Sequence, residues 1–286
     1  MTGGLAGNEP RRLKAELLRA LHHGDRPLVL PNAWDAASAK VFEAAGFPAI
    51  ATTSAGVCYA CGYADGERIP RRTMLAAVER IASAVAVPVT ADLEAGYGAG
   101  PAAVARTAEL LVAAGAVGLN LEDARGRSRR TLVAEAAHAG RVRAVREVAQ
   151  RSGVPIVINA RTDVFHFRGT TATQVAEAIH RGNAYLEAGA DSVFVPFVHA
   201  AATIGELVRG IRGPVNILGG PGTPPVAELA ALGVRRVSVG SGVMRATLGL
   251  ARRAAAELRE RGTYDLIGEW AIPYDELQQL FAAGGS

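Results

Sequence analysis

Cysteine is scarce in this chain: there are two residues, and both fall in the segment Cys58-Tyr-Ala-Cys61. So few cysteines exclude a disulfide-dense scaffold, in which several bridges compensate for a small core. A Cys-X-X-Cys segment can be a redox motif or half of a zinc site, but no second cysteine pair or histidine pair follows at ligand spacing. The segment also lies in a predicted glycine-bearing loop, residues 55–62, rather than at the start of a helix. We interpret both cysteines as small loop residues.

Long apolar runs and aromatic residues are also few. Aromatic residues make up 5% of the chain, and no run approaches the roughly 18 apolar residues that a membrane span needs. Residues 1–12 lack the apolar region of a secretory signal. We therefore expect no membrane partner and a cytoplasmic location, with residues 1–10 as a flexible N-terminal tail.

Neither sign of charge dominates, since 31 lysines and arginines face 27 acidic residues and the formal net charge is +4. The one dense basic cluster, residues 125–130, is short and has no interleaved aromatic residues, which nucleic-acid surfaces often combine with basic ones. We expect no nucleic-acid partner. The remaining composition, 49% hydrophobic and 20% charged, is that of a globular protein. Because no linker is visible, we expect residues 11–286 to form a single domain.

An internal repeat predicts the fold. Four apolar segments begin with a proline, and four others begin with a glycine that would end the preceding helix; along the chain the two kinds alternate. Glycine is the usual helix C-cap, and proline at the start of a strand costs no ladder hydrogen bond. The proline-led segments are 26–30, 87–90, 154–158 and 213–217, and the glycine-led segments are 45–50, 114–119, 188–193 and 232–237.

Helical patterns separate these predicted strands. They cover residues 36–45, 71–84, 101–114, 135–151, 173–188, 204–211, 225–232 and 245–261. The strands are continuous apolar runs, which indicates burial on both faces. Eight strand–helix units in about 230 residues are typical of a (β/α)8 barrel, whereas a doubly wound sheet does not explain a regular eightfold repeat. We predict an α/β fold, a (β/α)8 TIM barrel, with an extra N-terminal helix at 11–22 and a C-terminal helix at 274–282.

Acidic residues follow successive predicted strands. Asp92 and Glu94 end the third strand two residues apart, so their side chains point the same way. Asp65 lies in the loop after the second strand, and Glu122 ends the fourth. At the C-terminal end of a barrel, where active sites lie, four such carboxylates would repel one another unless a cation joined them. Oxygen ligands favour a hard ion, so we predict a Mg²⁺ site, with Mn²⁺ as the alternative ion. The competing interpretation is that each acid pairs with an arginine or caps a helix.

Cationic and N–H groups at the same end favour an anionic ligand. Arg161, after the fifth strand, can hold a carboxylate through two parallel hydrogen bonds, unless it forms an ion pair with Asp163 or Glu122. The turn at residues 53–56 offers backbone N–H groups. A metal beside a carbonyl and a carboxylate stabilises an enolate. The sequence therefore predicts an enzyme that acts on a small anionic oxo acid.

Several sequence segments, in this order between residues 31 and 241, resemble the isocitrate lyase/phosphoenolpyruvate mutase superfamily. They are Pro31-Asn-Ala-Trp-Asp-Ala-Ala-Ser-Ala39, Ala51-Thr-Thr-Ser-Ala-Gly56 with Gly62-Tyr-Ala-Asp-Gly66, Asp92-Leu-Glu-Ala-Gly-Tyr-Gly98, Gly118-Leu-Asn-Leu-Glu-Asp123 and Asn159-Ala-Arg-Thr-Asp163. The resemblance implies a (β/α)8 barrel whose C-terminal helices are swapped between subunits of a homotetramer, a dimer of dimers.

The resemblance also implies roles for individual residues. It implies that Mg²⁺ binds directly to Asp92, with Asp65, Glu94 and Glu122 acting mostly through water. On this basis the predicted metal site comprises Asp92, Glu94 and Glu122. The predicted catalytic residues are Asp65, Arg161 and Glu122. The predicted substrate-binding residues are Thr53, Ser54, Ala55, Asp65, Arg161 and Asn216.

One loop departs from the family pattern. Lyases of the superfamily have a Lys-Lys/Arg-Cys-Gly-His run after the fourth strand, with the cysteine as general acid. Here residues 127–131 occupy that stretch, and Arg130 replaces both this cysteine and the asparagine of the phosphonate mutases. Phe197 follows Pro196 after the sixth strand, where lyases often have an acid. We interpret His138, beyond the loop, as a surface histidine of a helix.

These residues together predict a Mg²⁺-dependent lyase or decarboxylase. It would make or break a C–C bond in a small 2-oxo acid that resembles oxaloacetate, through a metal-stabilised enolate, which needs no thiol. Two alternatives stay open. One is a P–C enzyme, either a phosphoenolpyruvate or carboxyphosphonoenolpyruvate phosphonomutase or a phosphonopyruvate hydrolase. The other is a catalytically inactive barrel that only binds a ligand.

Overall fold

The computed structural model describes residues 8–124, 131–168 and 171–282. Most of the predicted tail, residues 1–7, and the basic cluster at 125–130 lie outside the described residues. The expectations for these two segments, including the role of Arg130, therefore stay predictions.

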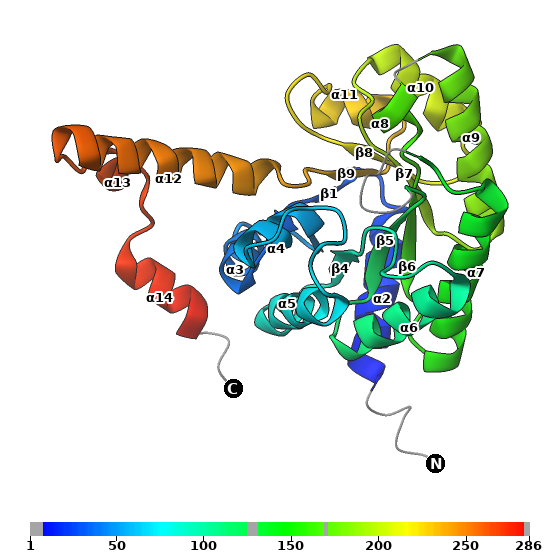
Figure 1. Cartoon of the computed structure of the whole chain (residues 1–286), viewed down its shortest axis with the longest axis horizontal. Coiled ribbons are helices and arrows are strands. Elements are labelled where there is room, and N and C mark those ends of the chain that lie inside the picture. Colours follow the sequence, from blue (N-terminus) through cyan, green and yellow to red (C-terminus); the bar gives the residue numbers. More distant parts are fainter. Residues whose placement is uncertain (1–7, 125–130, 169–170, 283–286) are drawn as a thin grey trace.

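Nine parallel strands form one sheet surrounded by helices (Figure 1). The strands are β1 (Leu28–Leu30), β2 (Asn32–Ala33), β3 (Ile50–Thr52), β4 (Val89–Asp92), β5 (Gly118–Glu122), β6 (Val157–Arg161), β7 (Ser192–Val195), β8 (Val215–Leu218) and β9 (Arg236–Ser238). Only Pro31 separates β1 from β2, so these two are halves of one barrel strand. β1 pairs with β9 and β2 pairs with β3, which closes the sheet. The predicted (β/α)8 TIM barrel is confirmed.

Helices follow the strands around the outside of the barrel. They are α2 (Glu9–Leu21), α3 (Ala36–Ala44), α4 (Ser54–Ala60), α5 (Arg71–Ala84), α6 (Pro101–Ala113), α7 (Glu135–Ser152), α8 (Val164–Arg168), α9 (Ala172–Glu187), α10 (Ala201–Gly210), α11 (Val226–Ala231), α12 (Gly242–Arg261), α13 (Asp265–Trp270) and α14 (Tyr274–Ala282). The long helices lie where the sequence places them, and three short ones, α4, α8 and α13, were not predicted. Among the described helices, none is both long and apolar enough to cross a membrane.

The glycines of the repeat end helices as predicted. Gly46, Gly115, Gly189 and Gly233 each have a positive φ, between 85° and 105°. An L side chain rarely adopts this backbone conformation, whereas glycine does so without strain. Each of these residues therefore stops a helix and turns the chain into the next strand.

Helix α2 packs across the N-terminal ends of the strands. Leu18 is fully buried, and a Cβ atom added at Gly118, the first residue of β5, would lie 2.8 Å from its Cδ2. Arg19 Nε donates a hydrogen bond of 3.0 Å to Asp191, just before β7. The helix therefore closes the end of the barrel opposite the predicted site.

Helix α2 also starts earlier than the sequence indicates. It begins at Glu9 rather than at residue 11, because Pro10 is favourable in a first helical turn. Asn8 is anchored, since its Nδ2 donates to the Ser152 carbonyl at 3.0 Å. Residues 8–10 are thus part of the folded structure and not of a tail.

The apolar core lies outside the sheet, between strands and helices. It combines strand residues such as Leu119 and Ile158 with helix residues such as Leu111 and Val145, and a second cluster does the same around β7 to β9. The interior of the barrel is polar instead. Buried polar side chains of its strands include Asn120, Asn159, Ser192, Asn216 and Arg236.

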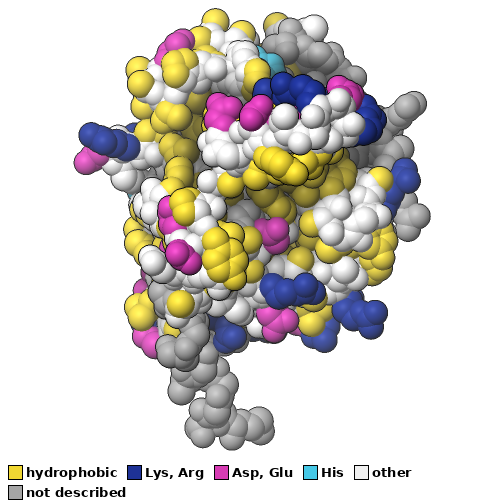
Figure 2. All heavy atoms as spheres, turned by 90° about the vertical axis from the view of Figure 1, so that its left-hand side faces the viewer, with side chains coloured by type: hydrophobic (Ala, Val, Ile, Leu, Met, Phe, Trp, Pro, Cys, Tyr) yellow, Lys and Arg dark blue, Asp and Glu magenta, His cyan; other side chains and the backbone are white. Residues whose placement is uncertain are grey.

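The last helices form an arm, which we define as α12, α13 and α14. Helix α12 extends away from the barrel, and α13 and α14 follow from its far end (Figure 1). The exposed apolar side chains of the arm include Leu248, Tyr264, Trp270 and Tyr274. Figure 2 faces this side of the molecule and shows hydrophobic side chains exposed on it.

Candidate active site

A cavity of about 330 Å³ opens at the C-terminal ends of the strands. We call it the central cavity. Of the predicted residues, Thr53, Ser54, Ala55, Asp65, Asp92 and Arg161 line it. The predicted residues Glu94, Glu122 and Asn216 are buried and do not line it.

The N-terminus of helix α4 holds the Asp92 carboxylate. Ser54 donates to Asp92 Oδ2 from its backbone N at 3.2 Å and from its Oγ at 2.8 Å. Thr53 caps the helix, and its side chain accepts a hydrogen bond from the Gly56 backbone N at 3.3 Å. The predicted turn is therefore a helix start, and one of the N–H groups expected to bind an anion already binds Asp92.

The second oxygen of Asp92 fits a cation. Asp92 Oδ1 is buried and has no hydrogen-bond partner among the described residues. A buried carboxylate oxygen without a partner is costly, and a hard cation satisfies it with the oxygen ligand that such ions prefer. Asp65 lines the same cavity, and its Oδ1 lies 3.5 Å from Ser54 Oγ. These residues fit the predicted magnesium ion.

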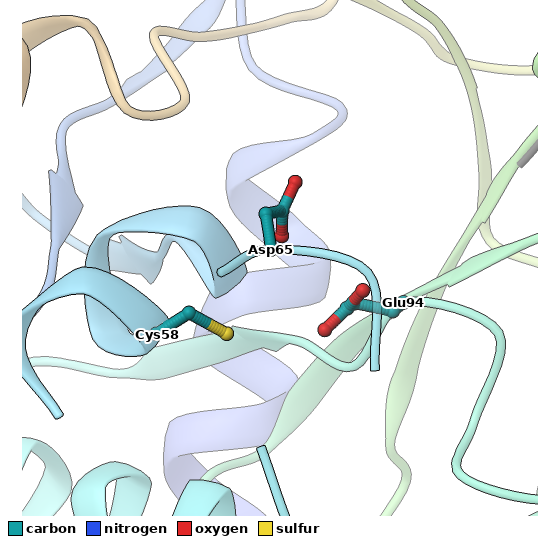
Figure 3. Close-up of side chains that lie close together, drawn as sticks. All are labelled: Cys58, Asp65 and Glu94. Atoms are coloured by element: carbon teal, nitrogen blue, oxygen red, sulfur yellow. The ribbon is translucent and has the colours of Figure 1, made fainter. Parts of the chain in front are cut away.

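Glu94, Asp65 and Cys58 lie together beside the cavity (Figure 3). One ligand atom of each lies within 4.8 Å of those of the others. In Figure 3 the Cys58 and Glu94 side chains point toward each other, and Glu94 Oε2 accepts a hydrogen bond of 2.7 Å from the Glu67 backbone N. The interpretation of both cysteines as loop residues is wrong for Cys58, which is buried in helix α4, whereas Cys61 is exposed after the end of that helix.

Arg161 forms both ion pairs that the sequence left open. Its guanidinium lies 3.1 Å from Glu122 Oε2, and its Nε and terminal nitrogen donate to Asp163 Oδ1 at 2.9 and 2.6 Å. The guanidinium also lies 5.6 Å from the ring centre of Phe194. The competing interpretation, an acid neutralised by an arginine, therefore applies to Glu122 and not to Asp92, which has no ion pair within the described chain.

A second buried acid positions this segment. Asp123 accepts hydrogen bonds from the Asp163 backbone N at 2.9 Å, from Thr162 Oγ1 at 2.8 Å and from the Tyr185 hydroxyl at 2.7 Å. Burial raises the pKa of Asp123, and these hydrogen bonds oppose the shift. The contacts tie the end of β5 to the end of β6 and so place Arg161 at the cavity.

Two residues lie deeper than the sequence suggests. Asn216 is fully buried and hydrogen-bonds to Ser238 at 3.3 Å, and Ser238 lines the cavity in its place. His138 is fully buried on the inner face of α7, with its ring centre 4.6 Å from that of Tyr185. The interpretation of His138 as a surface histidine is wrong, because α7 turns that face toward the core.

Comparison with known proteins identifies the family. Residues 18–259 match the family model described as phosphoenolpyruvate phosphomutase. The chain belongs to the phosphoenolpyruvate phosphomutase family. This membership confirms the resemblance to the isocitrate lyase/phosphoenolpyruvate mutase superfamily, and its members are lyases or mutases. The protein is therefore an enzyme with the lyase or mutase chemistry of that superfamily.

Three similar proteins illustrate this membership. An uncharacterised protein of Mycobacterium tuberculosis (strain H37Rv) is 38% identical over 261 residues, which cover 90% of this chain and 93% of the relative. An oxaloacetate decarboxylase of Bradyrhizobium sp. (strain BTAi1) is 30% identical over 234 residues, which cover 80% of this chain and 78% of the relative. A crystal structure from Burkholderia cenocepacia J2315, provisionally named a lyase/mutase, superposes with a TM-score of 0.89 at 38% identity and covers 96% of this chain and 97% of that one.

Proposed function

We propose that this member of the phosphoenolpyruvate phosphomutase family makes or breaks the C–C bond next to the carbonyl of a small 2-oxo acid, with oxaloacetate as the model substrate. The observation that supports this most is the buried Asp92 Oδ1, which lacks a hydrogen-bond partner among the described residues and belongs to a residue of the central cavity. The similarity to an oxaloacetate decarboxylase points to the same substrate class.

Asp92 and Asp65 would hold the divalent ion, Mg²⁺ or Mn²⁺, with Glu94 reaching it through water. When bound, the ion supplies positive charge beside the carbonyl oxygen as negative charge develops there. Ser54 orients Asp92 for this role through its two hydrogen bonds. Arg161 would bind a substrate carboxylate while Glu122 and Asp163 fix its orientation. A cavity of about 330 Å³ suits a small substrate, and Arg161 at its wall favours an anionic one.

P–C bond chemistry is the second candidate, and the family model itself, that of a phosphomutase, supports it. The same cavity and the same acids would serve a phosphonopyruvate-like substrate, whose phosphonate group takes the place of a carboxylate. Turnover of phosphonopyruvate, followed by phosphorus NMR, distinguishes the two reactions.

The deciding experiment is an oxaloacetate assay with Mg²⁺ in which pyruvate is measured by a coupled dehydrogenase. Free Mg²⁺ decarboxylates oxaloacetate slowly, so the matched control is Asp92→Asn at the same metal concentration. We expect the variant to lose at least about 100-fold in kcat, because the charge that holds the cation is gone. Equal rates of pyruvate formation for the two proteins would contradict the proposed function, and turnover of phosphonopyruvate would then favour the second candidate.

We further propose that the arm joins subunits of a homotetramer. Exposed apolar side chains follow the arm, and a cavity of about 850 Å³ lies between α12 and α3. Trp34, Phe42, Leu250 and Trp270 are among the residues that line it. A single chain leaves this apolar surface open to solvent, which favours an interaction surface. The swapped arm of a second subunit is the proposed occupant.

A further inference from the structure

Asn120 lies at the centre of a hydrogen-bond network inside the barrel. Its Oδ1 accepts two hydrogen bonds, one of 2.8 Å from Asn159 Nδ2 and one of 3.2 Å from a terminal nitrogen of Arg236. An amide turned the other way would put its NH₂ group against two donors, so these partners fix the orientation. Nδ2 has no hydrogen-bond partner among the described residues, and Asn120 lines the central cavity. The N–H groups of Asn120 therefore open onto that cavity.

The partner that donates from across the barrel is an arginine with no exposed surface. Arg236 extends from β9 to β5, which are not neighbours in the sheet, so its side chain crosses the interior. Its other terminal nitrogen lies 3.3 Å from His22 Nε2. His22 Nδ1 lies 2.7 Å from the Leu18 carbonyl oxygen, to which it must donate, so Nε2 accepts. Within the described chain Arg236 forms no ion pair, and the acid that acts on its charge is Asp92, through Coulomb attraction without a direct contact.

The second donor is fixed as well. Arg236 can only donate, so Asn120 Oδ1 is an acceptor and Asn159 has to present its Nδ2 to it. Asn159 Oδ1 then accepts a hydrogen bond of 2.7 Å from Ser192 Oγ. Residues of β6, β7, β9 and α2 thus fix the orientation of the Asn120 side-chain amide, either directly or through another residue of the network. This arrangement makes Asn120 a pre-organised donor, because no reorientation is needed when a ligand arrives.

We propose that the Nδ2 group of Asn120 is an oxyanion-binding donor of the central cavity, held and polarised by Arg236 as a positioning residue. This inference rests on the proposed function, in which negative charge develops on a substrate oxygen. A hydrogen bond from a charged group to Oδ1 polarises the amide and strengthens donation from Nδ2. Asn120 and Asp92 are cross-strand partners and both line the cavity. Asn120 Nδ2 and the proposed cation ligand Asp92 would therefore act on the same part of the substrate.

The test compares four variants by kcat, by KM and by oxalate binding in calorimetry, since oxalate is a planar analogue of an enolate. We expect Asn120→Ala to lower kcat about 100-fold and Arg236→Met to lower it about tenfold, with little change in KM. Arg236→Lys keeps the charge and should recover most of that loss. Thr90→Val is the matched control, because Thr90 is a buried barrel residue whose Oγ1 has no partner among the described residues; it should keep kcat within about twofold.

A double variant separates polarisation from simple support of the fold. If Arg236 acts through Asn120, Arg236→Met has less than about a twofold effect on kcat in the Asn120→Ala background. Equal losses in both backgrounds, or wild-type kcat in Asn120→Ala, would overturn the proposal while leaving the proposed function intact. If wild-type protein does not turn over oxaloacetate, the proposed function fails first. Oxalate binding then decides alone: an unchanged Kd in Asn120→Ala, or no binding to the wild type, would overturn the donor role.

Discussion

Burial sets the charge state of two histidines in this protein. His22 and His138 are both buried, and loss of hydration is the largest cause that lowers the pKa of each to about 3. Neighbouring arginines lower it further, Arg236 for His22 and Arg141 for His138. The unfolded chain binds a proton at each site below about pH 6.5, whereas the folded chain does so only near pH 3. Folding is therefore opposed as pH falls through this window, and the full stability is present above it.

We expect His138→Phe to make the protein less sensitive to acid. One histidine with these pKa values costs about 2 kcal/mol of unfolding free energy between pH 7 and pH 5. The stability of the wild type relative to His138→Phe should fall by that amount over the interval, as measured by urea unfolding at both pH values. His23→Gln, at an exposed site, is the control and should track the wild type. Parallel pH profiles for wild type and His138→Phe would contradict burial of an uncharged ring.

The sequence could predict the acids of the site but not their partners. Asp92 and Asp65 lie at the cavity because strand ends converge in any such barrel. Whether an arginine reaches an acid depends on side-chain conformation, so the choice of Glu122 and Asp163 by Arg161 could not be decided beforehand. Asn120 belongs to the segment 118–123, but the sequence indicates no role for it, since its contacts cross the barrel interior and follow no sequence spacing.

Among the elements, helix α2 has a structural role that its place in the sequence, before the first strand, does not indicate. It closes the barrel end opposite the cavity, with Leu18 against Gly118. We expect Leu18→Ala to lower the unfolding free energy by about 2–5 kcal/mol, the usual range for a buried leucine. Leu17→Ala, next to it but 48% exposed, should change the free energy by no more than about 0.5 kcal/mol. Equal effects of the two changes in urea unfolding would show that α2 does not close the barrel.

Long helices were predictable from sequence, whereas three short ones were not. Helix α11, with six residues, was predictable because Pro225 and Gly233 mark its ends. Helices such as α5 and α14 have the predicted bounds, because their apolar spacing continues over several turns. α4, α8 and α13 have five to seven residues each, too few for a helical period to stand out. The error at Cys58 follows from this, since a glycine-containing segment of that length resembles a loop.

On the scale of the whole molecule, the proposed tetramer predicts a mass. Light scattering should give about four times the 29.6 kDa of the chain for the wild type, as expected when apolar surface is shared between copies. Trp270 on the arm is 61% exposed, and Trp270→Glu should shift the mass to a smaller species. Leu17→Glu places the same charge on an exposed apolar site away from the arm and should leave the mass unchanged. A wild-type monomer would refute the assembly.

The polar interior of the barrel has a consequence for how such a protein can change over time. Because the apolar core surrounds the sheet, amides and an arginine occupy the centre where many barrels have branched aliphatic residues. Substitutions there alter hydrogen bonds near the substrate and remove little apolar burial. Substitutions inside the barrel could thus change the reaction during evolution, while the apolar core between the sheet and the helices kept the fold intact.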